Sequence, residues 1–441
     1  MKSADDASSS SIVCLIWKFA LASWHETKYT GLMEILKAFR YRMCPNDKQA
    51  QLFFKTFGAC RFVYNLCLDQ RELEWHRSAP RRISSYDQIN ELPDLKAVSP
   101  WLREVPNHAL QQKIIDLNKA YQKFFSGEGG YPKRKSKIGR QTFRYPDPKQ
   151  FRIEDGQIFL PKAGLVKFIQ HRPLQGKMKT ATVSFEAGVW HVSVQCEVTI
   201  AEPVAGSDVA VGIDINVLKP MVFSTREVIM LPRTTPMERK KLATLQQKVA
   251  RCKKGSNNRR KAVRRVARHH ARLARRRMDA AHKATTYAAK NFGTIMLEDL
   301  KIKNMTASAA GTIEDPGKNV AQKAGLNRSI LDIAPHQIRS MCEYKAIWYG
   351  SKVVIVPAPY TSQECSKCHY RHADNRKTQS EFLCLSCGHA DNADFNASDN
   401  IRAGGLPVMA CGSRRNGVRK QEKPLREEKE ARPFRAERSH D

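Results

Sequence analysis

The sequence predicts a β-rich module that carries a helical insertion, followed by an α/β domain. Apolar residues alternate with period two over much of residues 142–200, which is typical of strands. They recur at helical spacing in residues 46–125, and beyond residue 206 apolar strands alternate with helical stretches. A length of 441 residues indicates two or three domains, and an apolar fraction of 41% is sufficient for buried cores.

The first module opens with a strand over residues 34–45 that ends at a proline. Asn46 is expected to cap the helical stretch that follows, and a second helical pattern covers residues 101–125. Residues 127–141 form a basic, glycine-rich loop. The segments ATVSFEAG and VWHVSVQCEV then predict two paired strands that are joined near Gly188.

The α/β domain opens with VAVGIDINV at residues 209–217, which has the apolar pattern of a buried strand. The segments MVFS and EVIML are expected to complete a three-stranded meander. Further apolar strands are predicted at residues 293–299 and 351–357. The tail, residues 404–441, is rich in Arg, Lys and Glu, and we expect it to be disordered.

The N-terminal segment, residues 1–32, does not fit the rest of this pattern. Its apolar part, SIVCLIWKFALASW, contains Lys18 and follows two aspartates rather than the basic start of a signal peptide. It is also shorter than the roughly 20 apolar residues of a membrane span. We expect residues 1–32 to be an extension upstream of a natural start at Met33, and we expect no membrane partner.

The charge of the chain indicates a polyanionic partner. The sequence has 76 Lys and Arg against 43 Asp and Glu, a formal net charge of +33. Such an excess destabilises a compact protein by self-repulsion unless a polyanion compensates it. Nucleic acid fits better than a membrane surface, because no basic amphipathic helix adjoins a hydrophobic anchor.

A basic helical hairpin is predicted between Arg239 and Arg277, where seventeen Lys or Arg occur without one acidic residue. Apolar seams on either side of the turn at residues 255–258 predict two antiparallel helices. The alternative is a solvated charged face, but like charges at this density repel each other and a phosphate backbone would relieve that repulsion. The residues expected to contact nucleic acid are Lys253, Lys254, Arg259, Arg260, Arg264, Arg265, Arg268 and Arg272.

The twelve cysteines do not form a disulfide scaffold, because eight are scattered singly and four are clustered as two pairs. This pattern suits a reducing cytosol and one metal site. The pairs have metal-ligand spacing and predict a tetrahedral Zn²⁺ site made of Cys365, Cys368, Cys384 and Cys387. Four thiolates leave no open coordination position, so the expected role is structural. Nearby histidines are conceivable substitutes, and four cysteines without metal are the alternative.

Three acidic positions suggest a second kind of metal site. Asp214 lies within a predicted buried strand, Glu298 ends another, and Asp394 follows the cysteine module. A lone buried carboxylate is costly unless it is paired or binds a metal. Each acid alone could equally be a cap or turn residue. Together they suit a two-metal phosphodiesterase, in which carboxylate oxygens hold Mg²⁺ ions about 4 Å apart.

The order of motifs resembles the TnpB (OrfB) family of transposon-encoded nucleases. These proteins belong to the insertion sequence 200/605 group and are related to compact type V CRISPR effectors. The resemblance extends from about Met33 to the tail. It is carried by AFRYRMCPNDKQAQLFFKTFGACRFVYNLCL, GIDINV, IMLEDLKIKNM, LNRSILD, EYKAIWYGSKVV, TSQECSKC and FLCLSCGHADNADFNASDNI.

The resemblance implies a RuvC-like (RNase H-like) nuclease domain with an inserted basic hairpin and a zinc ribbon. A wedge-type β-barrel with a helical recognition insertion is implied before it. The expected bounds are 33–45 and 130–205 for the barrel, 46–129 for the insertion, 206–360 and 389–403 for the nuclease domain, and 361–388 for the zinc module.

The resemblance also implies an activity, partners and site residues. Asp214, Glu298 and Asp394 would be a catalytic triad that binds Mg²⁺ or Mn²⁺, and Arg376 could stabilise charge on the phosphate. The implied partners are a guide RNA from the transposon end and target double-stranded DNA. We expect one copy of the protein to bind its RNA as a monomer. We also expect the protein to be cytoplasmic and associated with the nucleoid.

Three alternatives remain open at this point. One is a catalytically silent, RNA-guided DNA-binding regulator, which is disfavoured because all three acids are present. Another is a DNA-binding transposition accessory without RNA, in which the carboxylates would have no task. A DDE transposase shares the metal chemistry but matches the motif order less well. The chain departs from the family at Asn216, where many relatives have glycine.

Overall fold

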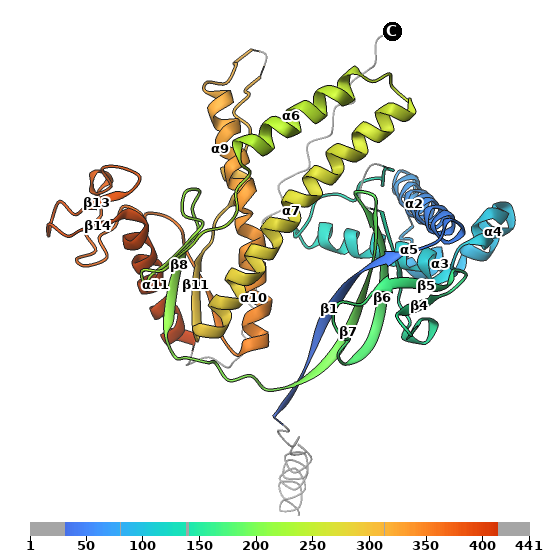
Figure 1. Ribbon diagram of the computed structural model, residues 1–441, viewed down its shortest axis with the longest axis horizontal. Helices are drawn as coiled ribbons and strands as arrows, with labels where there is room; N and C mark the ends of the chain where they lie inside the picture. The colour runs from blue at the N-terminus through green and yellow to red at the C-terminus, as the bar shows by residue number, and fades with distance from the viewer. Residues whose placement is uncertain (1–30, 80, 138–140, 313, 413–441) are drawn as a thin grey trace, which may run out of the picture.

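The computed structural model describes residues 31–79, 81–137, 141–312 and 314–412 (Figure 1). The predicted extension lies outside the described residues except for its last two positions, and Leu32 already begins the first strand. Within the described residues, no helix combines the length and the apolar character that a membrane span requires.

The first module is built on a seven-stranded antiparallel sheet with the order β2-β6-β7-β1-β5-β4-β3. The predicted pair joined near Gly188 is confirmed as β6 and β7. The strands are β1 (Leu32–Cys44), β2 (Gln141–Tyr145), β3 (Arg152–Glu154), β4 (Gln157–Leu160), β5 (Gly164–Ile169), β6 (Lys177–Glu186) and β7 (Val189–Ala201).

The expected wedge-type β-barrel corresponds to this sheet. Strands β2 and β3 are its edges, and no pairing among the described residues joins them. Helices α2 and α5 contact β2 instead, so the sheet is covered at this edge by helices. In the described part of the chain, the hydrogen bonding of this sheet is therefore not closed into a ring.

The helical insertion lies between β1 and β2, as predicted. Asn46 caps the first helix through a capping box with Gln49, which confirms the expected start. Apolar side chains of the helices and the sheet form one core, in which Phe57 stacks on Trp190. The helices are α2 (Asp47–Trp75), α3 (Ser85–Asn90), α4 (Leu92–Val98) and α5 (Asn107–Phe125), with a 3-10 turn η1 (Pro100–Glu104) before α5.

The second module contains a five-stranded mixed sheet with the order β10-β9-β8-β11-β12. Strands β8, β11 and β12 are parallel, and β8, β9 and β10 form the predicted antiparallel meander. The α/β expectation is thus confirmed for this sheet. The strands are β8 (Ala210–Asp214), β9 (Met221–Phe223), β10 (Val228–Ile229), β11 (Thr294–Glu298) and β12 (Lys352–Val356).

Helices cover both faces of this sheet. Val211 and Ile213 of β8 pack with residues of α7 (Asn257–Asn291) and α10 (Pro335–Tyr349) on one face. Because side chains alternate along a strand, Gly212 and Asp214 point to the other face, which α11 (Ala393–Gly412) covers (Figure 1). The sheet therefore separates an apolar core from the face that carries the first acid.

The predicted basic hairpin is confirmed as α6 (Pro236–Arg251) and α7, which pack against each other. The second helix is longer than the sequence indicated, because its C-terminal half continues as a core helix of the sheet. Two further helices, α8 (Ile302–Met305) and α9 (Val320–Ile333), precede α10.

The predicted tail from Gly404 is wrong for residues 404–412, which continue helix α11. Gly405 lies so close to Met296 that an added Cβ would be 2.5 Å from its sulfur. The helix therefore continues because its small residues pack on the sheet. Residues 413–441 lie outside the described part of the chain.

Candidate functional site

Asp214 and Glu298 occupy equivalent positions on neighbouring parallel strands. Where β8 and β11 pair with each other, the last pair is Ile213 with Leu297. Asp214 and Glu298 are the next residues of the two strands. Met296, two residues before Glu298, packs on Ile401 of α11, so Glu298 shares the face of Asp214. Both carboxylates are half-buried at the carboxyl edge of the sheet and face α11.

Helix α11 brings Asp394 to the same edge. Gly212 makes this possible, because a Cβ at this position would lie 2.1 Å from the carbonyl oxygen of Ser398. The backbone of α11 can therefore lie directly against β8. Asp394 is in the first turn of the helix and is 7% exposed. A glycine inside a predicted buried strand is a sequence signal that could have indicated this close approach, but no prediction was based on Gly212.

The acids act on one another electrostatically. Burial raises the pKa of Asp214 to about 6, and the neighbouring carboxylate of Asp394 adds to this rise. Burial also raises the pKa of Glu298 to about 7, and Asp214 adds to it. The three predicted acids are thus brought into one site whose negative charges are incompletely compensated.

Three neighbouring polar residues were not predicted as parts of this site. Asn216 donates a hydrogen bond from Nδ2 to Oδ2 of Asp214 at 2.9 Å, and the Thr361 hydroxyl donates to Oε1 of Glu298 at 2.5 Å. Lys219 Nζ lies 3.5 Å from Oδ2 of Asp394. Of the three, the sequence analysis named only Asn216, as the residue that replaces the glycine of many relatives.

Arg376 lies close enough to the acids for its positive charge to lower the pKa of Asp214. Its Nη2 donates to the carbonyl oxygen of Gln379 at 3.1 Å, which holds the guanidinium against its own loop. The preceding residue, Asn375, is fully buried and has a structural role. Its amide donates to the carbonyl oxygens of Gln363 and Tyr370.

The four predicted cysteines form one cluster. Their sulfur atoms all lie within 4.8 Å of one another, as a single tetrahedral ion requires. Among the described residues, they are the one group of three or more His, Cys, Asp or Glu whose ligand atoms lie together as a bound metal ion requires, and the three carboxylates do not form such a group. The short hairpin of β13 (Glu381–Leu383) and β14 (Ala390–Asn392) and the 3-10 turn η3 (Ala373–Asn375) complete the cysteine module.

The cysteine module is fastened to the helix that carries Asp394. Asn396 Nδ2 donates to the carbonyl oxygen of Glu364 at 2.7 Å, and its Oδ1 accepts from the backbone of Ser366 at 2.9 Å. Asn400, one turn further along α11, donates to the same Glu364 carbonyl and to that of Thr361. One face of α11 therefore holds the loop whose hydroxyl contacts Glu298.

The predicted nucleic-acid contacts lie on the hairpin, and all but Arg259 are exposed. Arg259 is half-buried and donates from Nη1 to the carbonyl oxygen of Val249 at 2.6 Å, which closes the turn between α6 and α7. Arg268 reaches the first module, because a Cβ at Gly188 would lie 3.7 Å from its Nη2. The exposed cations therefore lie on a hairpin that comes close to the first module at Arg268 and Gly188. Figure 1 shows the two helices of this hairpin, α6 and α7.

Three family models match this chain. The IS605 OrfB model described as "Probable transposase" matches residues 191–309, and the model "Cas12f1-like, TNB domain" matches residues 336–401. The IS605 OrfB model "Helix-turn-helix domain" matches residues 33–79, which here form strand β1 and the single helix α2.

Two relatives that match over most of their length are more than 30% identical to this chain. The chain is 38% identical over 382 residues to "Putative RNA-guided DNA endonuclease InsQ" of Escherichia coli (strain K12), covering 86% of this chain and 95% of that protein. It is 34% identical over 402 residues to "Putative RNA-guided DNA endonuclease" of Streptomyces pristinaespiralis, covering 90% and 95%.

Among solved structures, the chain is similar to a chain of the "Cryo-EM structure of the Cas12f1-sgRNA-target DNA complex". The TM-score is 0.47 at 13% sequence identity, and the match covers 84% of this chain and 99% of that chain.

Proposed function

Because this chain belongs to the IS605 OrfB (TnpB) family of transposon-encoded proteins, we propose that it is an RNA-guided DNA endonuclease that hydrolyses phosphodiester bonds. Its partners would be a guide RNA and target double-stranded DNA, in line with the names of its relatives. The second module would be the RuvC-like nuclease domain. The first module would be the wedge domain with its recognition insertion.

One observation carries the catalytic part of this proposal. Three carboxylates from three separate elements meet at one edge of a sheet, and burial and mutual repulsion raise the pKa values of Asp214 and Glu298. Such a set is stable when a cation offsets its charge, and carboxylate oxygens suit Mg²⁺ or Mn²⁺. Asp214, Glu298 and Asp394 would hold the ions. Divalent ions bound there would supply Lewis-acid stabilisation of phosphate charge and an activated water.

The surrounding residues would orient these acids. Asn216 donates to one oxygen of Asp214, and Thr361 donates to one oxygen of Glu298. Arg376 would add positive charge beside a bound phosphate. Lys219, whose ammonium group pairs with Asp394, would be a second positive charge beside the bound phosphate.

The four cysteines fit a structural zinc ion, since four thiolates complete a tetrahedron. Zinc would stabilise the loop that Asn396 and Asn400 hold against α11. Its effect on cleavage would therefore be indirect, through the position of Asp394.

The test is expression of the full chain together with its flanking genomic DNA, followed by sequencing of co-purified RNA. Duplex DNA matching that RNA should be cut in the presence of Mg²⁺. Asp214→Ala and Glu298→Gln should abolish cutting. Asp299→Asn is the matched control, because the carboxylate of this half-buried neighbour of Glu298 forms ion pairs with Lys301 and Arg339.

Each part of the proposal can fail separately. Absence of specific co-purified RNA would contradict guidance. DNA cleavage that survives Asp214→Ala would contradict the assignment of the active site. Equal losses of cleavage in Glu298→Gln and Asp299→Asn would show that any substitution at this edge of the sheet impairs the protein, and would contradict a specific role for Glu298.

A further inference from the structure

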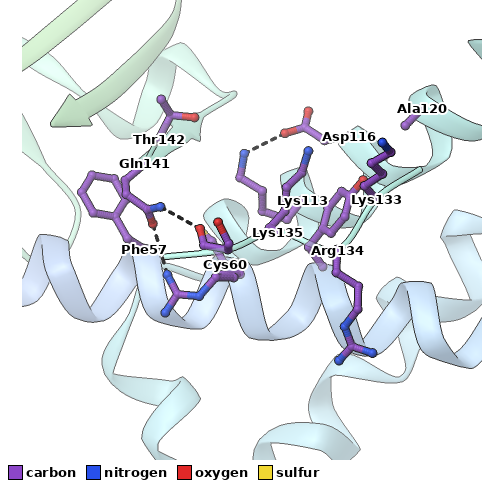
Figure 2. A pocket seen from close by; sticks show the side chains of 13 residues that line it. Phe57, Cys60, Lys113, Asp116, Ala120, Lys133, Arg134, Lys135, Gln141 and Thr142 are labelled. Carbon is purple, nitrogen blue, oxygen red and sulfur yellow. Dashed lines mark hydrogen bonds and ion pairs between the residues drawn. The ribbon is translucent and has the colours of Figure 1, made fainter. Parts of the chain in front are cut away.

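The turn between β9 and β10 carries an arginine, Arg226, that contacts two other elements of the second module. Its Nη1 forms an ion pair with Oδ2 of Asp391 in β14 at 2.9 Å, and its Nη2 forms one with Oδ2 of Asp399 in α11 at 3.0 Å. Other ion pairs are local: beside a cavity of about 490 Å³ in the first module, Lys113 pairs with Asp116 of the same helix (Figure 2). Arg226 instead joins segments that are 165 and 173 residues away in the sequence.

The two partners of Arg226 lie on either side of Asp394 in the sequence. Strand β14 ends at Asn392, whose Oδ1 accepts a hydrogen bond from the backbone N–H of Asp394 at 3.1 Å, and helix α11 then begins. The guanidinium of Arg226 also lies over the ring of Phe395, 5.1 Å from its centroid. Arg226 therefore holds both sides of the strand-to-helix junction that carries Asp394.

The turn that carries Arg226 is itself fastened to the strand of Asp214. The backbone N–H of Ser224 donates to the carbonyl oxygen of Gly212 at 2.9 Å, and the Gly212 N–H donates to Ser224 Oγ at 3.1 Å. Gly212 lies two residues before Asp214 on β8. Continuous contacts thus run from the strand of Asp214, through the turn and Arg226, to the junction that carries Asp394.

The backbone at Arg226 indicates that its side chain matters for geometry more than for stability. Its φ is +70°, a left-handed conformation that is unfavourable for any residue with a Cβ and that glycine adopts without strain. The side chain is 48% exposed, so solvent screens its ion pairs and each contributes little to stability. An arginine at this position is therefore explained by what it holds in place.

We propose that Arg226 is a positioning residue of the carboxylate site. It acts through Asp391 and Asp399, because its planar fork holds the start of α11 where Asp394 and Asp214 bind a divalent ion together. The inference rests on the proposed function, since it takes these acids as metal ligands. It adds a residue outside the site on which the affinity for the ion depends.

The main test variant is Arg226→Gly, because it removes the side chain and relieves the backbone strain at the same time. A positioning role predicts unchanged or higher stability together with weaker binding of a divalent ion. A purely stabilising role predicts the reverse, namely lower stability and unchanged ion binding. Stability is measured by urea unfolding of the full chain in buffer without added divalent ions, and a lowered urea midpoint with parental ion binding would overturn the proposal.

Ion binding is measured with Mn²⁺ and the full chain, purified free of nucleic acid, from the electron paramagnetic resonance signal of the free ion. The part of the binding that Asp214→Ala removes belongs to the carboxylates. Arg226→Gly should raise the dissociation constant of this part about tenfold, as loss of a residue that orients a metal ligand does elsewhere. Charge alone predicts the opposite sign, because removing a nearby cation strengthens the binding of another cation.

The possible results separate this inference from the proposed function. If the parent protein shows binding that depends on Asp214, and Arg226→Gly binds Mn²⁺ equally well or more tightly, the positioning role is overturned and the metal site stands. If the parent shows no binding that depends on Asp214, the proposed metal site fails, and this inference fails with it.

Arg402→Ala is the matched control. Arg402 is an exposed arginine whose Nη2 lies 4.0 Å from Oδ1 of the same Asp399, but it belongs to α11 and connects that helix to no other element through this pair. Its loss should change the dissociation constant of Mn²⁺ less than about twofold, as expected for an exposed pair. Equal weakening in Arg402→Ala and Arg226→Gly would trace the effect to Asp399 alone and contradict the connection to β8.

Arg226→Lys tests the geometry of the fork. It keeps the positive charge, but a single ammonium does not reproduce the two parallel contacts of a guanidinium. Its affinity for Mn²⁺ should lie between those of the parent and Arg226→Gly. Hydrogen exchange of the amides in the first turn of α11 should be faster in Arg226→Gly than in the parent and Arg402→Ala, because the junction is released. Equal exchange in all three proteins would contradict the proposal.

Discussion

Asp214 and Glu298 lie side by side at the carboxyl ends of β8 and β11, one position beyond the last hydrogen-bonded pair of these strands. Each acid raises the cost of ionising the site, as the elevated pKa values show. In a fold without a cation, this arrangement is unfavourable. It becomes favourable when a divalent ion is bound, so the stability of the protein should report on the state of the site.

Stability without divalent ions should fall as the pH rises. The folded pKa values, about 6 for Asp214 and about 7 for Glu298, exceed the ordinary values of 3.8 and 4.5. Between about pH 4 and 7 the folded state therefore holds protons that the unfolded state has released, and stability decreases across this window. Asp214→Asn with Glu298→Gln should remove the decrease and stabilise the fold by about 1–3 kcal/mol at pH 8. Urea unfolding from pH 5 to 8 would measure this.

The control for this prediction is Asp299→Asn, because hydrogen bonds from Lys301 and Arg339 lower the pKa of this half-buried carboxyl. It should leave the pH dependence of the parent protein in place. A parent protein whose stability rises steadily from pH 5 to pH 8 would contradict the charge repulsion described for the site.

Gly212→Ala should displace α11 and with it Asp394. The added Cβ would meet the carbonyl oxygen of Ser398 at 2.1 Å and the backbone nitrogen of Arg402 at 2.6 Å, and backbone cannot rotate away as a side chain can. The expected loss is about 1–3 kcal/mol of stability, together with most of the cleavage activity. Gly58→Ala is the control, since no atom other than those of the adjacent backbone of α2 lies within 4 Å of its added Cβ. It should stabilise the protein slightly, because alanine favours helix.

Separating the cysteine module from α11 should impair cleavage while the bound metal is retained. Asn396→Ala removes the amide that contacts Glu364 and Ser366 but no sulfur ligand. Zinc content, measured by elemental analysis, should stay near one per chain, and the cleavage rate should fall at least about tenfold. Cys365→Ser should lose both zinc and activity. Full activity in Asn396→Ala would show that the contact with α11 does not position the acid.

The sequence predicted the parts of this site that carry a strong local pattern. The cysteine spacing identified all four clustered thiols. The apolar pattern placed Asp214 within one buried strand and Glu298 at the end of another, and the structure has each acid at the end of its strand. The roles of Thr361 and Lys219 could not be predicted, because each contacts an acid that is distant in sequence or on another element. Such contacts depend on how loops cross the sheet edge, and local periodicity carries no information about that.

The fold was predicted less completely at places where tertiary packing overrides local pattern. A charge-rich composition indicated a disordered tail from Gly404, but small residues let α11 continue along Met296. Likewise, period-two alternation indicated strands without showing that helices cover the edge at β2. Arg259 looked like its basic neighbours in sequence, yet the turn folds its side chain onto the end of α6.

Arg259→Ala and Arg264→Ala should therefore separate a structural arginine from an exposed one. Arg259 donates to the carbonyl oxygens of Val249 and Cys252, whereas Arg264 is exposed on α7. Loss of the first should leave carbonyl groups at the end of α6 without this donor and destabilise the hairpin by about 1 kcal/mol or more. Loss of the second should leave stability unchanged and, if Arg264 contacts a phosphate, reduce the salt slope of nucleic-acid binding by about 1.

Hydrogen exchange of α6 amides would distinguish the two variants, because opening of the hairpin exposes them. Faster exchange is expected in Arg259→Ala alone. Equal protection in both variants would show that the contact with Val249 contributes little to the turn. An unchanged salt slope in Arg264→Ala would remove this arginine from the nucleic-acid surface while leaving the hairpin itself intact.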